Sequence, residues 1–282
     1  AKSVVYVDQD GVEHEQEARV IVVSAGSIQS PRLLLNSTSN AFPDGLGNSS
    51  GVVGKYFMQH LSLFSEALFP DRIDSYRGFN GGATSQDFAK TQANQSFARG
   101  WQTDLHNGII GPVQMAKQAH LWGKPLKDYM RRNFGHVAGL LTIGEQLPDE
   151  RNRVALDQEV KDEYGMPVPR ITFELRENDQ SMLVAMERKL KEIYDAAGAV
   201  KILKMGIRPG GGAHNMGTCR MGNDPTTSVL NSFCQSHDVS NLFVVDGSCF
   251  VTGGTANPSL TIHAIAARAS AYIVAEGRKM NL

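Results

Sequence analysis

Two short apolar runs near the ends of the chain predict strands. Residues 20–23 are Val-Ile-Val-Val and precede a turn at Gly26, and residues 241–245 are Asn-Leu-Phe-Val-Val and stop at Asp246-Gly247. The second run is typical of a buried parallel strand in an α/β sheet. Ligands of such sheets lie beyond the carboxyl ends of the strands. We therefore expect a ligand near Asp246 and Gly247, where glycine permits close approach.

A helix is predicted after each strand, because a capping residue and a proline follow it. Ser30 precedes Pro31, and Asn257 precedes Pro258. Ser and Asn are good N-caps, and proline fits the first helical position. The second helix should end near Gly277, and its N-terminus can stabilise an exposed anion by about 0.3 to 1 kcal/mol. Its buried apolar face should consist of Leu260, Ile262, Ile265, Ala266, Ala269 and Ile273.

Two antiparallel hairpins are predicted. Residues 4–7 are Val-Val-Tyr-Val and lead to a turn at Asp10-Gly11. Residues 153–157 and 170–175 alternate as half-buried strands and are joined through Tyr164-Gly165. These two segments should pair with each other.

The middle of the chain differs in composition. From about Leu61 to Trp122 it is rich in Gly, Asn, Gln, Ser and aromatic residues and has no helical period, which predicts strands and long loops. A helix capped by Asn178 or Asp179 should follow and stop at Gly198. Its apolar face is interpreted as core and consists of Leu183, Met186, Leu190, Ile193, Tyr194 and Ala197.

Composition permits more than one domain and excludes some partners. The chain has 282 residues, which is long enough to bury a substantial core. Its net charge is −1. Lys and Arg are scattered, so no nucleic acid is expected, and the pair Arg131-Arg132 is interpreted as a solvated face. No apolar run is long enough to span a bilayer, and no secretory leader begins at Ala1. The localisation is left undecided.

No metal site is predicted from the cysteine and histidine spacing. The three cysteines are too far apart for a common zinc or iron–sulfur pattern, and they are expected to be buried free thiols. Five histidines are discounted because no acidic or cysteine partner lies at ligand spacing, and His263 is discounted as a catalyst because it lies well inside the last predicted helix. The cysteines are Cys219, Cys234 and Cys249, and the five histidines are His60, His106, His120, His136 and His237.

His214 is the strongest candidate for catalysis. It follows Gly210-Gly211-Gly212, a segment too rich in glycine for the middle of a helix or strand, so we expect it on an irregular loop. Neutral imidazole has a pKa suited to abstracting a proton near neutral pH, and the Asn257 amide can donate to the same substrate oxygen. The alternative is that His214 is a hydrogen-bonded loop histidine and Asn257 only a cap.

Three segments resemble motifs of one enzyme family. Residues 214–222, 244–248 and 257–261, taken in order, resemble the carboxyl-terminal signature of the glucose-methanol-choline (GMC) oxidoreductases, which use FAD. Residues 20–37 are similar to that family's second signature, which helps hold the adenine end of FAD. Residues 54–60, Gly-Lys-Tyr-Phe-Met-Gln-His, resemble the segment that leads out of its flavin domain.

The resemblance implies a reaction and a set of site residues. The catalytic pair would be His214 and Asn257, and the substrate an alcohol, sugar, sugar acid or polyol, as in bacterial gluconate or sorbitol dehydrogenases of the family. An electron-accepting cytochrome or quinone is a possible partner, and the family suggests a periplasmic, membrane-associated complex. The residues expected to bind FAD are Ala25, Gly26, Asn215, Met216, Asp246, Gly247, Asn257, Pro258, Ser259 and Thr261.

The expected fold is of the α/β and α+β classes, with two parts. Residues 1–59 and 206–282 would form part of a glutathione-reductase-like FAD-binding domain, and residues 60–205 a substrate domain with an antiparallel sheet and flanking helices. The family normally begins with a βαβ unit carrying Gly-x-Gly-x-x-Gly, and these residues contain none. We therefore expect the chain to be the carboxyl-terminal half of a longer enzyme.

Two alternatives stay open from the sequence. The same family contains hydroxynitrile lyases, which bind flavin without moving electrons. The chain by itself could also be an inactive, cofactor-free lobe that works only with its missing half.

Overall fold

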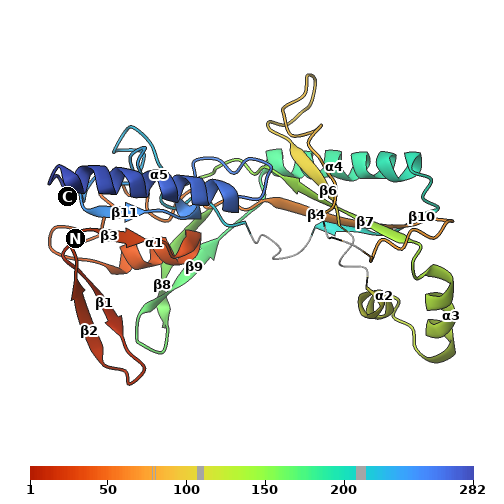
Figure 1. The fold of residues 1–282 in the computed structure, drawn as a ribbon, viewed down its shortest axis with the longest axis horizontal. Helices are drawn as coiled ribbons and strands as arrows, with labels where there is room; N and C mark the ends of the chain where they lie inside the picture. The colour runs from red at the N-terminus through yellow and green to blue at the C-terminus, as the bar shows by residue number, and fades with distance from the viewer. Residues whose placement is uncertain (78, 80, 107–110, 208–213) are drawn as a thin grey trace.

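The computed structural model describes residues 1–282 except 78, 80, 107–110 and 208–213. It has two lobes that lie side by side along its long axis (Figure 1). One lobe carries both termini, and its ends are held together because the Ala1 amino group donates to Asn241 Oδ1 at 2.6 Å and Arg19 Nη2 donates to the Leu282 carbonyl at 2.5 Å. The glycines predicted to place His214 on a loop, 210–212, lie outside the described residues.

The lobe with the termini, called here the terminal lobe, is built around the predicted parallel strand. β11 (Leu242–Val244) pairs in parallel with β3 (Ile21–Val23), and every β11 residue is buried, so this prediction is confirmed. The predicted first hairpin is also confirmed, as β1 (Ser3–Val7) and β2 (Glu13–Glu17), with Gly11 at φ +79° in its turn. The helices of this lobe are α1 (Gly26–Asn36), the short η1 (Gly247–Cys249) and α5 (Ser259–Arg278).

Helix α1 begins earlier than predicted, so the expected cap at Ser30 is wrong. Its N-cap is Ala25, and Pro31 lies inside the helix. The Ser30 hydroxyl has other partners: it accepts from Ala25 N at 3.1 Å and donates to Asp246 Oδ2 at 2.5 Å. A buried carboxylate thus outweighs the local preference of serine for a helix cap.

Helix α5 starts one residue later than predicted. Its N-cap is Pro258, and no side chain caps it, so the predicted Asn257 cap is wrong. The helix continues past Gly277 to Arg278. Ala269 is fully buried, whereas Leu260 is 83% exposed and does not belong to the buried face. Four residues of the predicted face pack against the core as partly buried side chains, namely Ile262, Ile265, Ala266 and Ile273.

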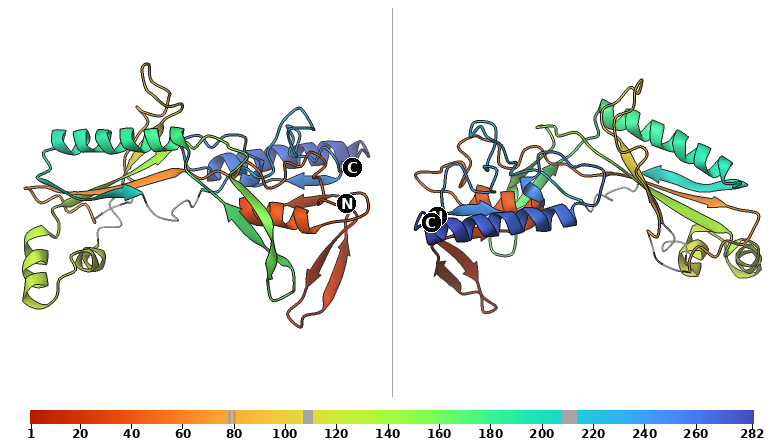
Figure 2. Two further views of the ribbon diagram at one scale, coloured as in Figure 1. Left: turned by 180° about the vertical axis from the view of Figure 1, so that it is seen from behind. Right: turned by 45° about the horizontal axis from the view of Figure 1, so that its top comes forward.

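The second lobe contains the predicted antiparallel sheet, of five strands in the order β10-β4-β7-β6-β5. Helix α4 covers one face, and α2 and α3 lie at the far end on the opposite side (Figures 1 and 2). The strands are β4 (Leu61–Leu68), β5 (Thr84–Ser85), β6 (Trp101–Leu105), β7 (Val137–Gly144) and β10 (Lys201–Ile207). The helices are α2 (Pro112–Gln118), α3 (Gly123–Asn133) and α4 (Glu177–Ala196).

Helix α4 has most of the predicted core face but a different start, and Ala197, which was predicted on that face, is exposed at the C-cap. Leu183, Met186 and Leu190 are buried against the sheet, and Gly198 follows the helix at φ +82°, as expected of a C-terminal glycine. The N-cap is Arg176, so neither predicted cap is correct. Asp179 stabilises this end from inside the helix, because its Oδ2 accepts from Arg176 N at 2.9 Å.

The second predicted hairpin is confirmed and lies against α1. β8 (Arg153–Lys161) pairs antiparallel with β9 (Pro167–Thr172). Arg32 of α1 donates from Nη2 to Asp162 Oδ2 at 2.5 Å and from Nε to the Pro167 carbonyl at 2.9 Å. The hairpin therefore packs with the terminal lobe, although it falls within residues 60–205. The predicted division into domains stays a prediction.

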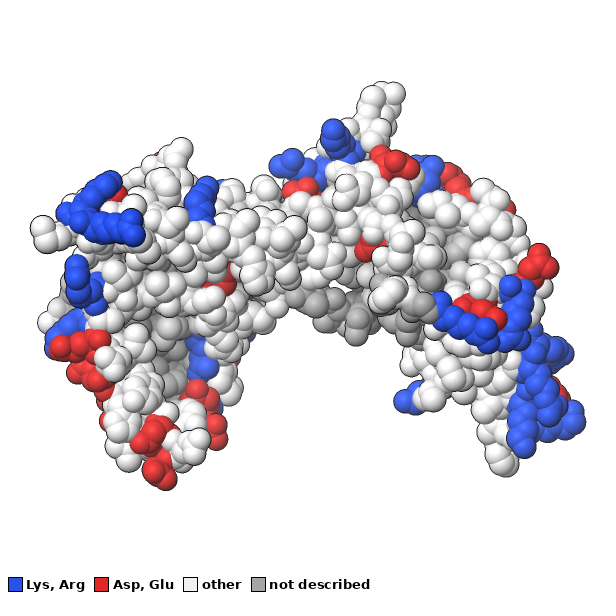
Figure 3. Space-filling model, viewed as in Figure 1, with Lys and Arg blue, Asp and Glu red and all other residues white. Residues whose placement is uncertain are grey.

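Charged side chains are unevenly placed on the surface. In Figure 3 the molecule is hollowed between the lobes, acidic residues gather on the hairpins of the terminal lobe, and basic residues gather around the end of the other lobe that carries α3. On α3, Arg131 lies 3.5 Å from Asp128, and both side chains are solvated.

Candidate active site

Three side chains from distant segments meet where the two lobes join. The Nδ1 atoms of His60 and His214 are 2.8 Å apart. On the other side of the His214 ring, Asn257 Nδ2 lies 3.3 Å from His214 Nε2. The predicted catalytic pair is therefore in contact, and His60 is a third member of the cluster.

Two backbone segments run side by side to place the histidines. Met58 and Met216 exchange two backbone hydrogen bonds, each 2.9 Å long, and both side chains are completely buried. Next to them, Gln59 Nε2 donates to Asn215 Oδ1 at 2.9 Å. Since His60 and His214 each lie two positions from one of the paired methionines, the ladder sets the distance between the rings.

Residues that follow the carboxyl end of β11 pack against this ladder. Asp246 accepts hydrogen bonds from Gly26 N at 2.9 Å and from Ser248 N at 2.8 Å, in addition to the Ser30 hydroxyl. Gly247 is needed for close approach, since a Cβ at this position would lie 2.7 Å from the carbonyl oxygen of Asn215. The predicted close approach at Gly247 is thus made by the protein's own backbone.

The five-stranded sheet of the second lobe reaches the site through Gln102 of β6. Gln102 Nε2 lies 3.5 Å from Asn257 Oδ1 and 3.3 Å from Asp104 Oδ2. Gln102 is buried, whereas Asn257 is exposed. Asn257 can therefore turn its amide toward a ligand while its oxygen faces a donor from the other lobe.

Both histidines are neutral near pH 7. Burial, followed by the neighbouring His214, lowers the pKa of His60 to about 4, against an opposing effect of the Gly254 and Gly253 backbone. Burial also lowers the pKa of His214 below its ordinary value of 6.5. A neutral imidazole has a free lone pair, so His214 has the protonation state that a general base requires.

The residues predicted to bind a cofactor fall into two groups. Some are exposed or beside open space and can touch a ligand, namely Ala25, Gly26, Asn257, Ser259 and Thr261. The others are partly or fully buried and hold the fold at this point, namely Asn215, Met216, Asp246, Gly247 and Pro258. Met216 has both backbone groups paired and its side chain in the core, which favours packing over a cofactor contact.

The exposed group leaves two places in the terminal lobe where a ligand such as FAD can reach the backbone. Gly26 follows β3 at φ +80° and has nothing within 4 Å of where a Cβ would stand, so a ligand can approach its backbone. The first turn of α5 is exposed at Ser259, Leu260 and Thr261. Because the first N–H groups of a helix have no acceptor within it, this end can stabilise a negatively charged ring.

Sequence reasoning missed two members of the site. His60 was discounted because no acid or cysteine stands near it in sequence, but its partner is a histidine 154 positions away. The sequence did hold one indication of a role for His60, which is the last residue of segment 54–60, the segment that resembles the GMC family. Gln102 carries no local signal, since only the sheet topology brings β6 beside Asn257.

The three cysteines are buried. The expectation of buried free thiols is confirmed for Cys219, Cys234 and Cys249. Burial raises the pKa of Cys219 to about 12, so it is not a nucleophile at neutral pH. Among the described residues, no group of three or more His, Cys, Asp or Glu side chains could hold a metal ion. The same residues include no helix with the length and hydropathy needed to cross a membrane.

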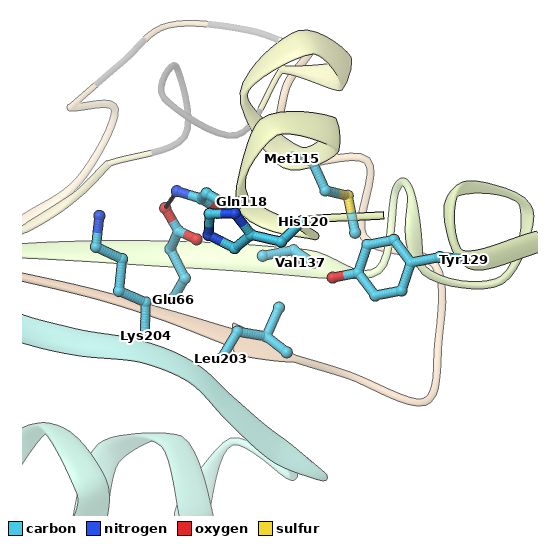
Figure 4. Close-up of a pocket in the computed structure, with 8 residues that line it drawn as sticks. All are labelled: Glu66, Met115, Gln118, His120, Tyr129, Val137, Leu203 and Lys204. Atoms are coloured by element: carbon cyan, nitrogen blue, oxygen red, sulfur yellow. Dashed lines mark hydrogen bonds between the residues drawn. The ribbon is translucent and has the colours of Figure 1, made fainter. Parts of the chain in front are cut away.

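A separate cavity of about 330 Å³ lies between the sheet and helices α2 and α3 (Figure 4). In it, Gln118 Nε2 donates to Glu66 Oε1 at 3.4 Å. Glu66 stands six positions beyond His60 along β4, about 20 Å at roughly 3.3 Å per residue. This cavity is therefore distinct from the histidine cluster.

Comparison with known proteins identifies the family. Residues 148–266 match the family model described as GMC oxidoreductase, and this part of the chain belongs to that family. The match contains His214 and Asn257.

Curated relatives align along nearly the whole chain. The chain is 40% identical over 282 residues to 2-methyl-1,2-propanediol dehydrogenase of Mycolicibacterium austroafricanum, covering 97% of this chain and 51% of that protein. It is 29% identical over 279 residues to the fructose dehydrogenase large subunit of Gluconobacter japonicus, covering 95% and 49%. The chain thus spans about half the length of the curated relatives it matches.

Solved structures share the fold. Pyridoxine 4-oxidase from Mesorbium loti has a TM-score of 0.61 at 18% identity, covering 96% of this chain and 54% of that one. A variant of Aspergillus oryzae RIB40 formate oxidase has a TM-score of 0.68 at 14% identity, covering 99% and 58%. The predicted fold class, mixed α/β and α+β with an antiparallel sheet, is confirmed.

Proposed function

We propose that the protein containing this chain is an FAD-dependent oxidoreductase that acts on CH–OH groups. The observation that carries the proposal is the contact of His214 Nε2 with Asn257 Nδ2 at 3.3 Å, beside the exposed first turn of α5. A base, an oxygen-binding amide and a helix N-terminus are the protein groups that removal of a hydride and a proton from an alcohol requires.

The protein's own residues would handle the proton and the substrate oxygen. Bound FAD supplies the acceptor for the hydride, which carries two electrons. His214 Nε2 takes the hydroxyl proton, and Asn257 Nδ2 donates to the same oxygen, so the alcohol becomes an aldehyde or ketone. FAD would be held by Ala25 and Gly26 at one end and by Asn257, Ser259 and Thr261 at the other. Asp246, Gly247, Asn215, Met216 and Pro258 would support these contacts.

The proposed substrates are small polyols, sugars and sugar acids. Three relatives support this range, since they are named for 2-methyl-1,2-propanediol, fructose and gluconate. The 40% identity to the first of them makes 1,2-diols the first group to test.

The electron acceptor we propose is a cytochrome or a quinone. The fructose dehydrogenase relative is named as a large subunit, which supports an enzyme that works with another chain. Other relatives are named oxidases. Rates of reoxidation of the reduced protein by air and by a soluble quinone, measured side by side, distinguish an oxidase from a dehydrogenase.

The test is the visible spectrum of the full natural protein containing these residues. It is recorded after addition of FAD and then of 2-methyl-1,2-propanediol, fructose or gluconate under nitrogen. Bleaching by one of them, and much slower bleaching in His214→Gln, would support the proposal. Bound flavin that stays oxidised while a cyanohydrin releases cyanide would replace it with a hydroxynitrile lyase. A protein that binds no FAD would overturn it.

A further inference from the structure

The hydrogen bonds of the histidine cluster fix which nitrogens carry hydrogen. His60 Nε2 lies 2.9 Å from the carbonyl oxygen of Gly254, which can only accept, so Nε2 carries the hydrogen. In the neutral ring, His60 Nδ1 is then an acceptor. His214 Nδ1, 2.8 Å away, must be the donor.

This leaves the lone pair of His214 on Nε2, the atom that faces Asn257. Asn257 Nδ2 is a donor, and its 3.3 Å contact suits a bare nitrogen. The cluster is thus a one-way series of donors, from Asn257 to His214, from His214 to His60 and from His60 to the Gly254 carbonyl.

We propose that His60 is a positioning residue that holds His214 in the tautomer whose Nε2 is the catalytic base. The inference rests on the proposed function, in which that nitrogen takes the substrate proton. In serine proteases, an orienting partner that favours the wrong histidine tautomer lowers kcat about 10⁴-fold, so the effect of such a residue can be large.

The surroundings of His60 hold its ring in place. The residue is 4% exposed, and its ring meets that of His214 edge to face, with an interplanar angle of 83° and centroids 5.0 Å apart. A Cβ on Gly253 would lie 2.9 Å from Met216 Cε and 3.5 Å from His60 Nε2, so glycine makes room for the buried ring. Such packing leaves little freedom for the imidazole to turn over.

His60 stays an acceptor through the reaction. Its low pKa keeps it neutral at working pH, and among the described residues His214 is the one titratable group that shifts it. When His214 Nε2 gains the substrate proton, Nδ1–H still points at His60 Nδ1. That hydrogen bond stabilises the imidazolium, so the proton remains on His214.

The direct test is the tautomer of His214 in ¹⁵N-histidine-labelled full natural protein, read by NMR. We compare wild type with His60→Leu, which removes the acceptor, and His60→Asn, whose side-chain oxygen can take the place of Nδ1. The matched control is His237→Leu, because His237 Nε2 also lies 3.2 Å from a backbone carbonyl, that of Gly222, but its side-chain partner is Ser228 and not His214.

In wild type and in His60→Asn we expect hydrogen on His214 Nδ1. In His60→Leu we expect that preference to be lost, with kcat for the best alcohol lowered about 10²-fold or more. The ascending limb of the kcat/KM pH profile should also move to lower pH, since the imidazolium loses an acceptor. A residue that only filled space would lower activity without moving that limb.

The outcomes separate this inference from the proposed function. Hydrogen on His214 Nε2 in wild type overturns it, as does a His60→Leu protein that keeps the wild-type tautomer and kcat. If the tautomer changes as expected but no alcohol reduces the flavin, the positioning role stands and the proposed oxidation fails.

Discussion

The Thr218 hydroxyl donates to the backbone oxygen of Ser27 at 2.9 Å, inside helix α1. That oxygen would normally accept from the N–H of residue 31, four positions on, but Pro31 has none. Thr218 is completely buried, and its φ of +87° is rare for a β-branched residue. Thr218, in the loop after His214, therefore supplies the hydrogen bond to the Ser27 oxygen that Pro31 cannot donate.

Replacing Thr218 by valine should lower the free energy of unfolding by about 1 to 3 kcal/mol, because the Ser27 oxygen then has no donor in a buried place. Urea unfolding measures this. Thr218→Ser is the matched control and should be much closer to wild type. In the background Pro31→Ala, whose new N–H can reach Ser27, Thr218→Val should cost less. An equal cost in both backgrounds would show that the two residues are not coupled.

Gly247→Ala should destabilise the protein by about 1 to 3 kcal/mol, because the added carbon meets backbone rather than a flexible side chain. Its Cβ would lie 2.7 Å from the Asn215 oxygen. Since Asn215 is adjacent to His214, FAD-dependent turnover should fall as well. Gly277→Ala, with nothing within 4 Å of its Cβ, is the control and should be neutral or slightly stabilising. Equal midpoints for the two variants in urea would contradict the steric argument.

Asp246→Asn should weaken the join between β11 and α1. Oδ2 of Asp246 accepts from both Gly26 N and Ser30 Oγ, and an amide offers one oxygen and a misplaced donor. Because bonds to a charged group contribute about 1.5 to 3 kcal/mol, we expect a loss of that order in the free energy of unfolding. Asp238→Asn is the control, since this carboxylate holds Ser49 at the exposed surface. FAD titration should show weaker binding in Asp246→Asn and unchanged binding in Asp238→Asn.

The sequence pattern predicted which helices and strands form better than it predicted where the helices begin. The parallel strand at 241–245 and the core positions Leu183, Met186 and Leu190 of α4 were correct because burial alone determines them. The predicted caps failed because the capping side chains had stronger partners elsewhere. Ser30 bonds to Asp246 and Asn257 to His214, and both partners come from distant parts of the chain.

The same reason limits prediction of the site. His214 and Asn257 lie in motifs that can be recognised, but their contact with His60 and Gln102 depends on how four segments cross. A histidine without acidic neighbours in sequence carries no sign of a histidine partner 154 residues away.

The pH dependence of turnover should be set by His214. Burial lowers its pKa from 6.5, and a base works only when deprotonated, so kcat/KM should fall as the pH drops through a value below 6.5. Asn257→Asp places a carboxylate near Nε2, which favours the imidazolium and should move this limb to higher pH. Asn257→Leu is the control: it removes the amide donor to Nε2 but adds no charge, so its limb should rise less than that of Asn257→Asp. A wild-type limb above pH 6.5, or a limb that Asn257→Asp leaves in place, would mean that a group other than His214 takes the proton.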